Sequence, residues 1–224
     1  MKNSAIIVLC LVLSACGGGG GGSDGGSAAS GIRVLHAAVD TAPLDIVSAL
    51  APEVIVGTTR FAQLSPYLQF PEGAQDLVLT KAKTTAPQLF SLPLEVTKGM
   101  KNTVLVFGNQ DDLGLRIVRF DNDASALAEA LVDGQSGVRV VHGVVGAGHI
   151  SVSLGGEKLF ASIPFGGVSE YLLLDSGSQS LLAIRAADKK TLKSAALNFE
   201  SKRVYTVLVS GEAEFYVVVR AYQD

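Results

Sequence analysis

The sequence predicts an all-β protein made of two tandem antiparallel β-sandwich (Ig-like) domains, preceded by a signal peptide and a glycine-rich tether. Three observations predict this class. Apolar residues alternate with polar ones, as they do in half-buried strands. Turn residues recur at short intervals between these segments, which is typical of antiparallel sheets. The chain also repeats its own landmarks once, at a spacing of about 100 residues, which is the size of a domain and not of a solenoid repeat.

Residues 1–15 are predicted to be a signal peptide. Lys2 forms a short positive region, and the apolar run Ala5–Leu13 is too short for a membrane-spanning helix, which needs roughly 20 apolar residues. The segment leads into the sequence Leu-Ser-Ala-Cys at residues 13–16, which resembles the lipobox of bacterial lipoproteins. The resemblance implies that residues 1–15 are removed and that Cys16 carries lipid. An ordinary secretion signal is the alternative.

Residues 16–30 are predicted to form a lipidated cysteine and a flexible tether. After Cys16 the stretch contains only Gly, Ser, Ala and Asp24, a composition that cannot bury apolar surface. In the lipoprotein family an aspartate after the cysteine signals retention in the inner membrane, and here Gly17 takes its place. The resemblance therefore implies the outer membrane, at its periplasmic face or at the cell surface. Because Cys10 lies within the signal peptide, no disulfide is expected in the mature chain.

Residues 31–122 and 137–224 are predicted to be two copies of one β-sandwich. The matching landmarks, in chain order, are Gly31–His36 with Gly137–His142, Phe61–Leu68 with Phe165–Leu172, Thr103–Val106 with Thr206–Val209, and the pair Arg119 and Asp123 with the pair Arg220 and Asp224. Their spacing drifts by only a few residues, which indicates duplication with short loop deletions. In the first strand, Ile32, Val34 and His36 are expected on one face, with Arg33 and Leu35 on the other. Such strands are expected to be half-buried.

Residues 123–136 are predicted to connect the two units. The segment Asp123–Asp133 is rich in Ala, Leu and Glu, Leu127 and Leu131 lie four residues apart, and Gly134 suits a helix C-cap. These features favour a short helix that packs between the units. An irregular linker is the alternative.

The first strand and the turn after it resemble a bacterial envelope family described only as a domain of unknown function. The family pattern reads Arg-Val-Val-His-Ala, then Asp-Ala-Pro, then Val-Asp-Val, and Arg33–Ile46 matches it with Thr41 inserted in the second block. The second unit keeps Arg139–His142 and replaces the rest with Gly146–Ser151. The family commonly occurs in tandem on lipoproteins and cell-wall proteins. The resemblance implies fold and location, and it brings no established activity.

Four residues recur in the two units and are the candidate surface or structural positions: His36, His142, Tyr67 and Tyr171. Alternation places each histidine on the apolar face of its strand, where a neutral ring would bond to a backbone carbonyl or a hydroxyl. One histidine in each unit does not make a zinc site, which needs three or four converging ligands. The tyrosines are candidates to line a sugar-binding surface. The alternative is packing at a sheet edge with the hydroxyl in solvent.

Other motifs give no catalytic residue, metal site or cofactor. Gly146–His149 resembles a dinucleotide-binding turn but lacks the third glycine and is followed by a strand pattern, so no nucleotide is expected. His149 itself is expected in an exposed turn. Asp40 and Asp45 are too few for calcium, and each is expected to bond its own backbone at a turn. The sequence contains no Gly-x-Ser-x-Gly elbow, no free cysteine nucleophile and no paired carboxylates on one strand face.

The amino-acid composition limits the classes of partner that are expected. The chain is 48% hydrophobic, has a formal net charge of −3 and contains no Trp. This weak negative balance gives no reason to expect DNA, RNA or anionic lipid as a partner. The sequence therefore predicts a non-enzymatic, lipid-anchored envelope or surface module that binds a protein or a glycan. The alternative is a structural or assembly lipoprotein that scaffolds an outer-membrane complex without a small ligand.

Overall fold

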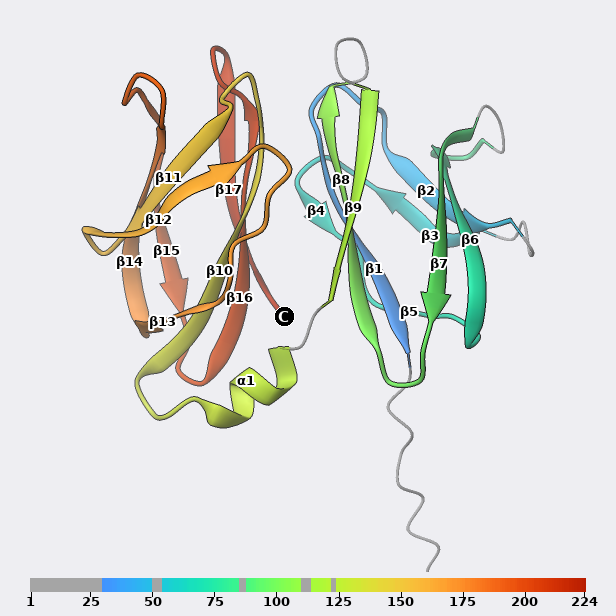
Figure 1. Cartoon of the computed structure of the whole chain (residues 1–224), viewed down its shortest axis with the longest axis horizontal. Coiled ribbons are helices and arrows are strands. Elements are labelled where there is room, and N and C mark those ends of the chain that lie inside the picture. The colour runs from blue at the N-terminus through green and yellow to red at the C-terminus, as the bar shows by residue number, and fades with distance from the viewer. Residues whose placement is uncertain (1–29, 50–53, 85–87, 110–113, 122–123) are drawn as a thin grey trace, which may run out of the picture.

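The first unit is a sandwich of two sheets (Figure 1). The computed structural model describes residues 30–49, 54–84, 88–109, 114–121 and 124–224. One sheet has the strand order β4-β1-β8-β9, with β5 also paired to β1, and the other has the order β3-β2-β6-β7. The strands are β1 (Gly31–Ala38), β2 (Leu44–Ser48), β3 (Val54–Thr59), β4 (Gln63–Leu64), β5 (Leu68–Gln69), β6 (Gly73–Lys81), β7 (Gln88–Val96), β8 (Lys101–Asn109) and β9 (Gly114–Asp121).

The second unit repeats this arrangement. Its sheets have the strand orders β13-β10-β16-β17 and β12-β11-β14-β15. The strands are β10 (Gln135–Val145), β11 (His149–Leu154), β12 (Glu157–Pro164), β13 (Leu172–Asp175), β14 (Gly177–Arg185), β15 (Thr191–Phe199), β16 (Arg203–Glu212) and β17 (Tyr216–Gln223). The predicted fold class, two tandem β-sandwiches, is thus confirmed. Within each unit one central pairing, β1 with β8 or β10 with β16, is parallel, and the other pairings are antiparallel.

Each sandwich has its own apolar core. In the first unit, Ile32 and Val34 from β1 pack with residues of the second sheet such as Leu77 and Leu79. The second unit has a larger cluster of the same kind, in which Val138 and Val140 hold the positions equivalent to Ile32 and Val34. The alternating positions of the first strand therefore face the core as predicted, because odd and even residues of a strand point to opposite faces.

A third cluster joins the two units. It contains Leu35, Ala37, Leu105 and Phe107 from the first unit and Val141 and Leu208 from the second. The sheets that contain β1 and β10 therefore pack against each other, and the units stand side by side (Figure 1). Each fully buried Leu or Phe stabilises the pairing by about 1.5–3 kcal/mol.

The prediction of half-buried strands is wrong for the strands at this contact. Every residue of β1 is buried, and so is nearly every residue of β8, β10 and β16. The reason lies in the packing of the two units against each other. The face that would meet solvent in an isolated sandwich is covered by the other unit.

A seven-residue helix, α1 (Ala124–Ala130), lies in the segment predicted as the connector. Leu131 and the partly buried Leu127 pack with Val204 of β16. The close approach of Leu127 to Gly137 leaves no room for a side chain at that glycine, since an added Cβ would lie 2.9 Å from Leu127 Cδ2. The helix is thus fixed to the second unit. Within the described part of the chain, no helix has the length and apolar character needed to cross a membrane.

The strand register corrects one of the predicted repeat landmarks. Leu105 of β8 pairs with Val118, whereas Leu208 of β16, its counterpart, pairs with Arg220. Val118 therefore corresponds to Arg220, and the predicted match of Arg119 with Arg220 is wrong by one position. A shift of one residue moves a side chain to the other face of the strand. Asp123 lies outside the described residues.

Candidate functional site

Each repeated tyrosine follows a serine two residues earlier, Ser65 before Tyr67 and Ser169 before Tyr171, and the two serines make the same backbone contacts. Ser65 Oγ accepts a hydrogen bond of 2.8 Å from the Val34 amide, and Ser169 Oγ accepts one of 2.8 Å from the Val140 amide. Each hydroxyl also donates to the carbonyl of the residue that follows it, at 2.9 Å. These bonds attach the segment that contains Ser65 to β1 and the segment that contains Ser169 to β10. The attachment fixes the position of the tyrosine two residues further on.

The repeated histidines lie in the sandwich cores, fully buried. His142 Nδ1 accepts a hydrogen bond of 3.1 Å from the Val144 amide, and Nε2 lies 3.1 Å from the Gly148 carbonyl oxygen. A ring that accepts at one nitrogen and faces a carbonyl with the other is the neutral Nε2–H tautomer. Burial lowers the pKa of His142 to about 4.

His36 occupies the equivalent position in the first unit. Burial lowers the pKa of His36 to about 4. The Ala42 carbonyl beside the ring favours the protonated form, but its effect on the pKa is smaller than that of burial. Neither ring nitrogen is within hydrogen-bond geometry of a partner. Both histidines are therefore neutral core residues at pH 7. Among the described residues, no group of three His, Cys, Asp or Glu side chains is placed to hold a metal ion.

The repeated tyrosines each cover an arginine. The Arg33 guanidinium carbon lies 4.5 Å from the centre of the Tyr67 ring, and that of Arg139 lies 4.6 Å from the centre of the Tyr171 ring. The expectation that the hydroxyls point to solvent is wrong for Tyr171, whose hydroxyl donates a hydrogen bond of 2.7 Å to Asp224 Oδ2. Burial, followed by the negative charge of Asp224, raises the pKa of Tyr171. Tyr67 is half-buried and lines a small recess together with residues of the second unit, among them Lys202 and Asp224, whereas Tyr171 is half-buried within the second unit. A sugar-binding role for these tyrosines stays a prediction.

Asp224 lies at the centre of this polar cluster, which the sequence did not single out as a site. Its carboxylate accepts hydrogen bonds from Arg33 Nη2 and, at 2.7 Å, from Thr206 Oγ1, and it lies 3.9 Å from Arg139 Nη2. The three ionic side chains are almost wholly buried. Buried charges need such paired and hydrogen-bonded surroundings. The cluster is thus a structural connection between the units.

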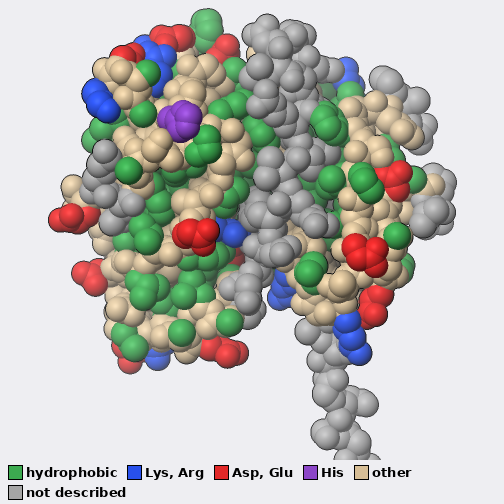
Figure 2. All heavy atoms as spheres, in the orientation of Figure 1, with side chains coloured by type: hydrophobic (Ala, Val, Ile, Leu, Met, Phe, Trp, Pro, Cys, Tyr) green, Lys and Arg blue, Asp and Glu red, His purple; other side chains and the backbone are tan. Residues whose placement is uncertain are grey.

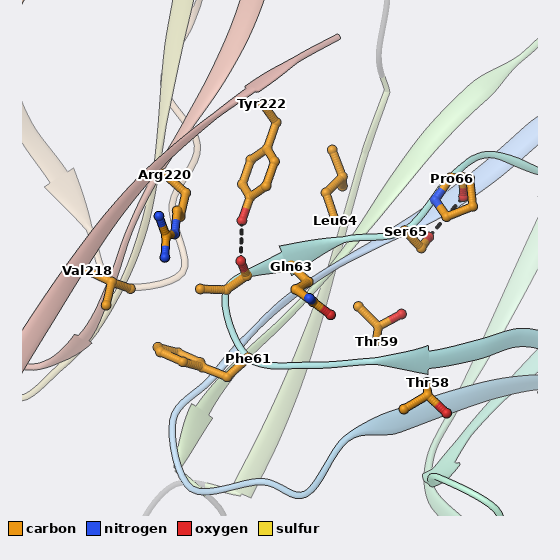
Figure 3. A pocket seen from close by; sticks show the side chains of 11 residues that line it. Thr58, Thr59, Phe61, Gln63, Leu64, Ser65, Pro66, Val218, Arg220 and Tyr222 are labelled. Atoms are coloured by element: carbon orange, nitrogen blue, oxygen red, sulfur yellow. Dashed lines mark hydrogen bonds between the residues drawn. The ribbon is translucent and has the colours of Figure 1, made fainter. Parts of the chain in front are cut away.

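The recess between the units is the principal candidate site. It is a cavity of about 620 Å³ whose walls come from both sandwiches (Figure 3). The second unit contributes alternate residues of β17, because Val217, Val219 and Ala221 face its core and leave the other face of the strand to the recess. The lining residues are Thr58, Thr59, Phe61, Ala62, Gln63, Leu64, Ser65, Pro66, Val218, Arg220 and Tyr222.

The side chains of this interunit pocket are held in place from both sides. The Tyr222 hydroxyl donates a hydrogen bond of 2.6 Å to the Ala62 carbonyl and so connects β17 to the first unit (Figure 3). Phe61 contacts the Tyr216 ring edge to face, with 6.0 Å between ring centres. Arg220 is exposed, and its guanidinium group extends from β17 toward the recess (Figure 3). The pocket therefore combines aromatic, hydroxyl, amide and cationic groups.

Asp45 holds Thr58, one of the residues that line the pocket. Asp45 Oδ1 accepts a hydrogen bond of 2.6 Å from the Thr58 amide, and Oδ2 accepts one of 2.7 Å from the Lys83 amide. Both of these residues have positive φ values, 31° and 64°, which are unfavourable for residues with a side chain. The prediction that Asp45 serves its own turn is wrong. The buried carboxylate lies in β2 and bonds to two segments far along the chain.

Other charged groups lie on the surface of the second unit, where Arg185 pairs with Asp188 and Glu214, and Lys190 also pairs with Glu214. On the face shown in Figure 2, acidic and basic side chains occur both in mixed groups and singly among hydrophobic and neutral ones. Gly146 and Gly148 form the turn from β10 into β11, so the motif that resembles a dinucleotide-binding turn leads into a strand. The predicted lipid-attachment residue, Cys16, lies outside the described residues.

The fold and the site define a class: a tandem β-sandwich protein in which two repeats share a buried interface and a pocket. The chain belongs to the family described as domain of unknown function DUF4397, which matches residues 30–132 and 136–223. The family found in the sequence is therefore present in two adjacent copies.

Comparison with solved structures finds a carbohydrate-binding module, CBMbc of family CBM26, from Eubacterium rectale Amy13K in complex with maltoheptaose. The two chains are 13% identical, the match covers 87% of this chain and 97% of that chain, and the TM-score is 0.27. A likeness at this TM-score says nothing about what the present chain binds. No curated protein matches the sequence significantly.

Proposed function

We propose that this chain is a non-enzymatic binding module of the cell envelope, anchored by lipid at Cys16, whose ligand is a glycan held in the interunit pocket. The observation that carries the proposal is the pocket itself. A recess of about 620 Å³ is within the size range of small-ligand sites, and its walls are positioned by hydrogen bonds from both units.

The lining chemistry favours a saccharide. A sugar ring presents apolar C–H faces and a rim of hydroxyl groups, so it needs an aromatic surface next to hydrogen-bonding side chains. Phe61 and Tyr222 supply the aromatic surface, and Thr59, Gln63 and Arg220 supply polar groups around it. These groups lie on strands and on a pinned segment, so little ordering is required when a ligand binds.

The same lining argues against hydrolysis of the bound sugar. Glycoside hydrolysis uses a pair of carboxyl groups on either side of the scissile bond. The described residues that line the pocket include no Asp or Glu. Binding without turnover is therefore the function that this pocket supports.

A glycan-binding measurement tests the proposal. The purified chain is titrated with envelope and extracellular oligosaccharides, and the Phe61→Ala variant is compared with Phe215→Ala, which removes an exposed aromatic ring outside the pocket. We expect Phe61→Ala to weaken binding at least about tenfold, which corresponds to about 1.4 kcal/mol, and Phe215→Ala to bind like the unmodified chain. Failure of every saccharide to bind would refute the proposal.

The anchor is tested separately. Cells fed a labelled fatty acid should incorporate it into the chain, and Cys16→Ser should abolish both the labelling and the co-sedimentation with outer membranes. Protease treatment of intact cells distinguishes a surface position from a periplasmic one. Incorporation of label into the Cys16→Ser variant would exclude this residue as the attachment point.

A second candidate function, assembly of an outer-membrane complex without a small ligand, is favoured by one surface feature. At the turn between β16 and β17, Phe215 is 79% exposed and Tyr216 is 45% exposed. Large exposed aromatic residues are enriched at protein contact sites. If this function holds, mild solubilisation recovers one stoichiometric partner, and Phe215→Ala releases it. Recovery of the chain as a free monomer counts against it.

A further inference from the structure

Arg220 adds a positive charge to the lining of the interunit pocket. It is the only Lys, Arg, Asp or Glu among the described lining residues. Its guanidinium group makes no hydrogen bond or ion pair with any residue that the structure describes, whereas Arg33 and Arg185 are both paired with carboxylates. A guanidinium carries five N–H donors in a planar fork, and such a group at a recess is suited to an acidic ligand.

A second donor group lies beside Arg220 in the pocket lining. Gln63 Oε1 already accepts a hydrogen bond of 3.0 Å from the Arg60 amide, which leaves the side-chain NH₂ as its available group. Ser65 Oγ accepts from the Val34 amide and donates to the Pro66 carbonyl, so it is occupied within the protein. Arg220 and the Gln63 NH₂ group therefore supply available donors, which a carboxylate, an acceptor-only group, complements. The Tyr222 and Thr58 hydroxyls donate within the protein, to the Ala62 carbonyl and to Asp45 Oδ1, and retain acceptor capacity for the hydroxyl groups of a sugar.

The positive charge of Arg220 acts on the pocket wall. Burial raises the pKa of Tyr222 to about 12, and the charge of Arg220 opposes this rise. The guanidinium group and the Tyr222 phenol extend from alternate residues of β17 and lie near each other, as Figure 3 shows.

We propose that the pocket binds an acidic saccharide, with Arg220 pairing the carboxylate of a uronic acid residue while Phe61 lies against the sugar ring. This inference rests on the proposed glycan-binding function and specifies the class of glycan. A singly charged carboxylate is favoured over a phosphate, because one guanidinium balances one negative charge and the described lining supplies no second cation.

Titration calorimetry with a matched pair of probes tests the inference. The full chain is titrated with trigalacturonate and with its fully methyl-esterified form, which keeps the sugar rings and removes the charges. We expect the acid to bind more tightly than the ester and to lose affinity as salt is raised. Arg220→Gln should weaken binding of the acid about ten- to a hundredfold, as expected for loss of a charge-assisted hydrogen bond, and should weaken binding of the ester by a clearly smaller factor.

Two controls make the outcomes distinct. Lys193→Gln makes the same change in net charge at an exposed position of β15 and should bind both probes like the unmodified chain. Arg220→Lys retains the charge but not the fork and should fall between the unmodified chain and Arg220→Gln. Equal binding of acid and ester by the unmodified chain, or no effect of Arg220→Gln, overturns the inference and leaves the proposed glycan function in place. If neither probe nor any neutral glycan binds, the proposed function fails as well.

Discussion

Asp224 of the second unit forms a buried ion pair with Arg33 of the first unit, 191 positions earlier in the chain. The same carboxylate lies 3.9 Å from Arg139 Nη2, which is the counterpart of Arg33 in the other repeat. One carboxylate therefore lies next to the guanidinium groups of two equivalent arginines. Because the arginines come from different sandwiches, their shared partner connects the units in addition to the apolar contact between them.

Removal of this carboxylate is expected to destabilise the whole chain. Asp224→Asn keeps the shape of the side chain but removes the negative charge that pairs with the buried guanidinium group of Arg33, a change that typically costs about 3–5 kcal/mol. The free energy of unfolding is measured by urea titration with far-ultraviolet circular dichroism. Glu214→Gln, which removes an exposed partner of Arg185 and Lys190, is the control and should change stability little. Equal stability of the two variants would contradict this account of the cluster.

The hydroxyl of Ser210 is expected to contribute to the contact between the units. Ser210 Oγ lies 2.8 Å from the Ala37 carbonyl oxygen of the first unit and 3.1 Å from that of Gly143. Ser210→Ala removes a buried hydrogen bond between the units, which should cost about 0.5–1.5 kcal/mol in unfolding free energy. Ser178→Ala, at an exposed position of β14, is the matched control and should be close to neutral. A neutral Ser210→Ala would show that this bond is dispensable.

Gly166 is expected to tolerate no side chain, because Phe107 of the other unit occupies the space. An added Cβ would lie 2.2 Å from Phe107 Cζ, and the backbone has a φ of 77°. Gly146, with a φ of 78° and its nearest neighbour at 3.9 Å, is a control with the same backbone strain and no clash. We expect Gly166→Ala to lower the unfolding free energy by about 1–3 kcal/mol more than Gly146→Ala does.

A double variant checks the origin of that difference. If the clash is responsible, Gly166→Ala should cost less in a Phe107→Ala background than in the unmodified chain, because the coupled change relieves the overlap. Additive effects of the two substitutions would place the cause of the instability elsewhere.

The buried histidines are expected to make stability depend on pH. Their pKa values fall from 6.5 to about 4 in the folded chain. The unfolded chain therefore binds more protons between these values, so this contribution is complete above pH 6.5 and is lost as the pH falls toward 4. The loss is up to about 3 kcal/mol for each ring.

Urea titrations between pH 7 and pH 4 measure this dependence. His142→Gln should flatten the curve by about half of the histidine contribution, because it removes one of the two rings whose pKa is lowered to about 4. A slope unaffected by His142→Gln would assign the pH dependence to other groups.

The sequence by itself was sufficient to predict the strands and the duplication. Ile32, Val34 and His36 face one core because strand geometry alternates side chains between two faces, a local property that requires no partner. The equivalence of Arg33 with Arg139, and of Tyr67 with Tyr171, could be recognised because the sequence of the first unit recurs in the second. Their role was not visible, because a repeated residue carries no information about which residue of the other copy it meets.

Only the tertiary structure decided which faces of the sandwiches meet and what lies between them. The outward positions of β1 and β10 look solvent-facing in an isolated unit, and they are buried because each sandwich covers the other. The pocket follows from the same docking, since β17 and the segment after β3 are far apart in sequence and neither forms the recess alone. Strand geometry determines the face on which a side chain lies, and this can be read from the local sequence. Which distant segment then covers that face depends on how the two folded units pack. The spacing of residues within one unit does not encode that packing.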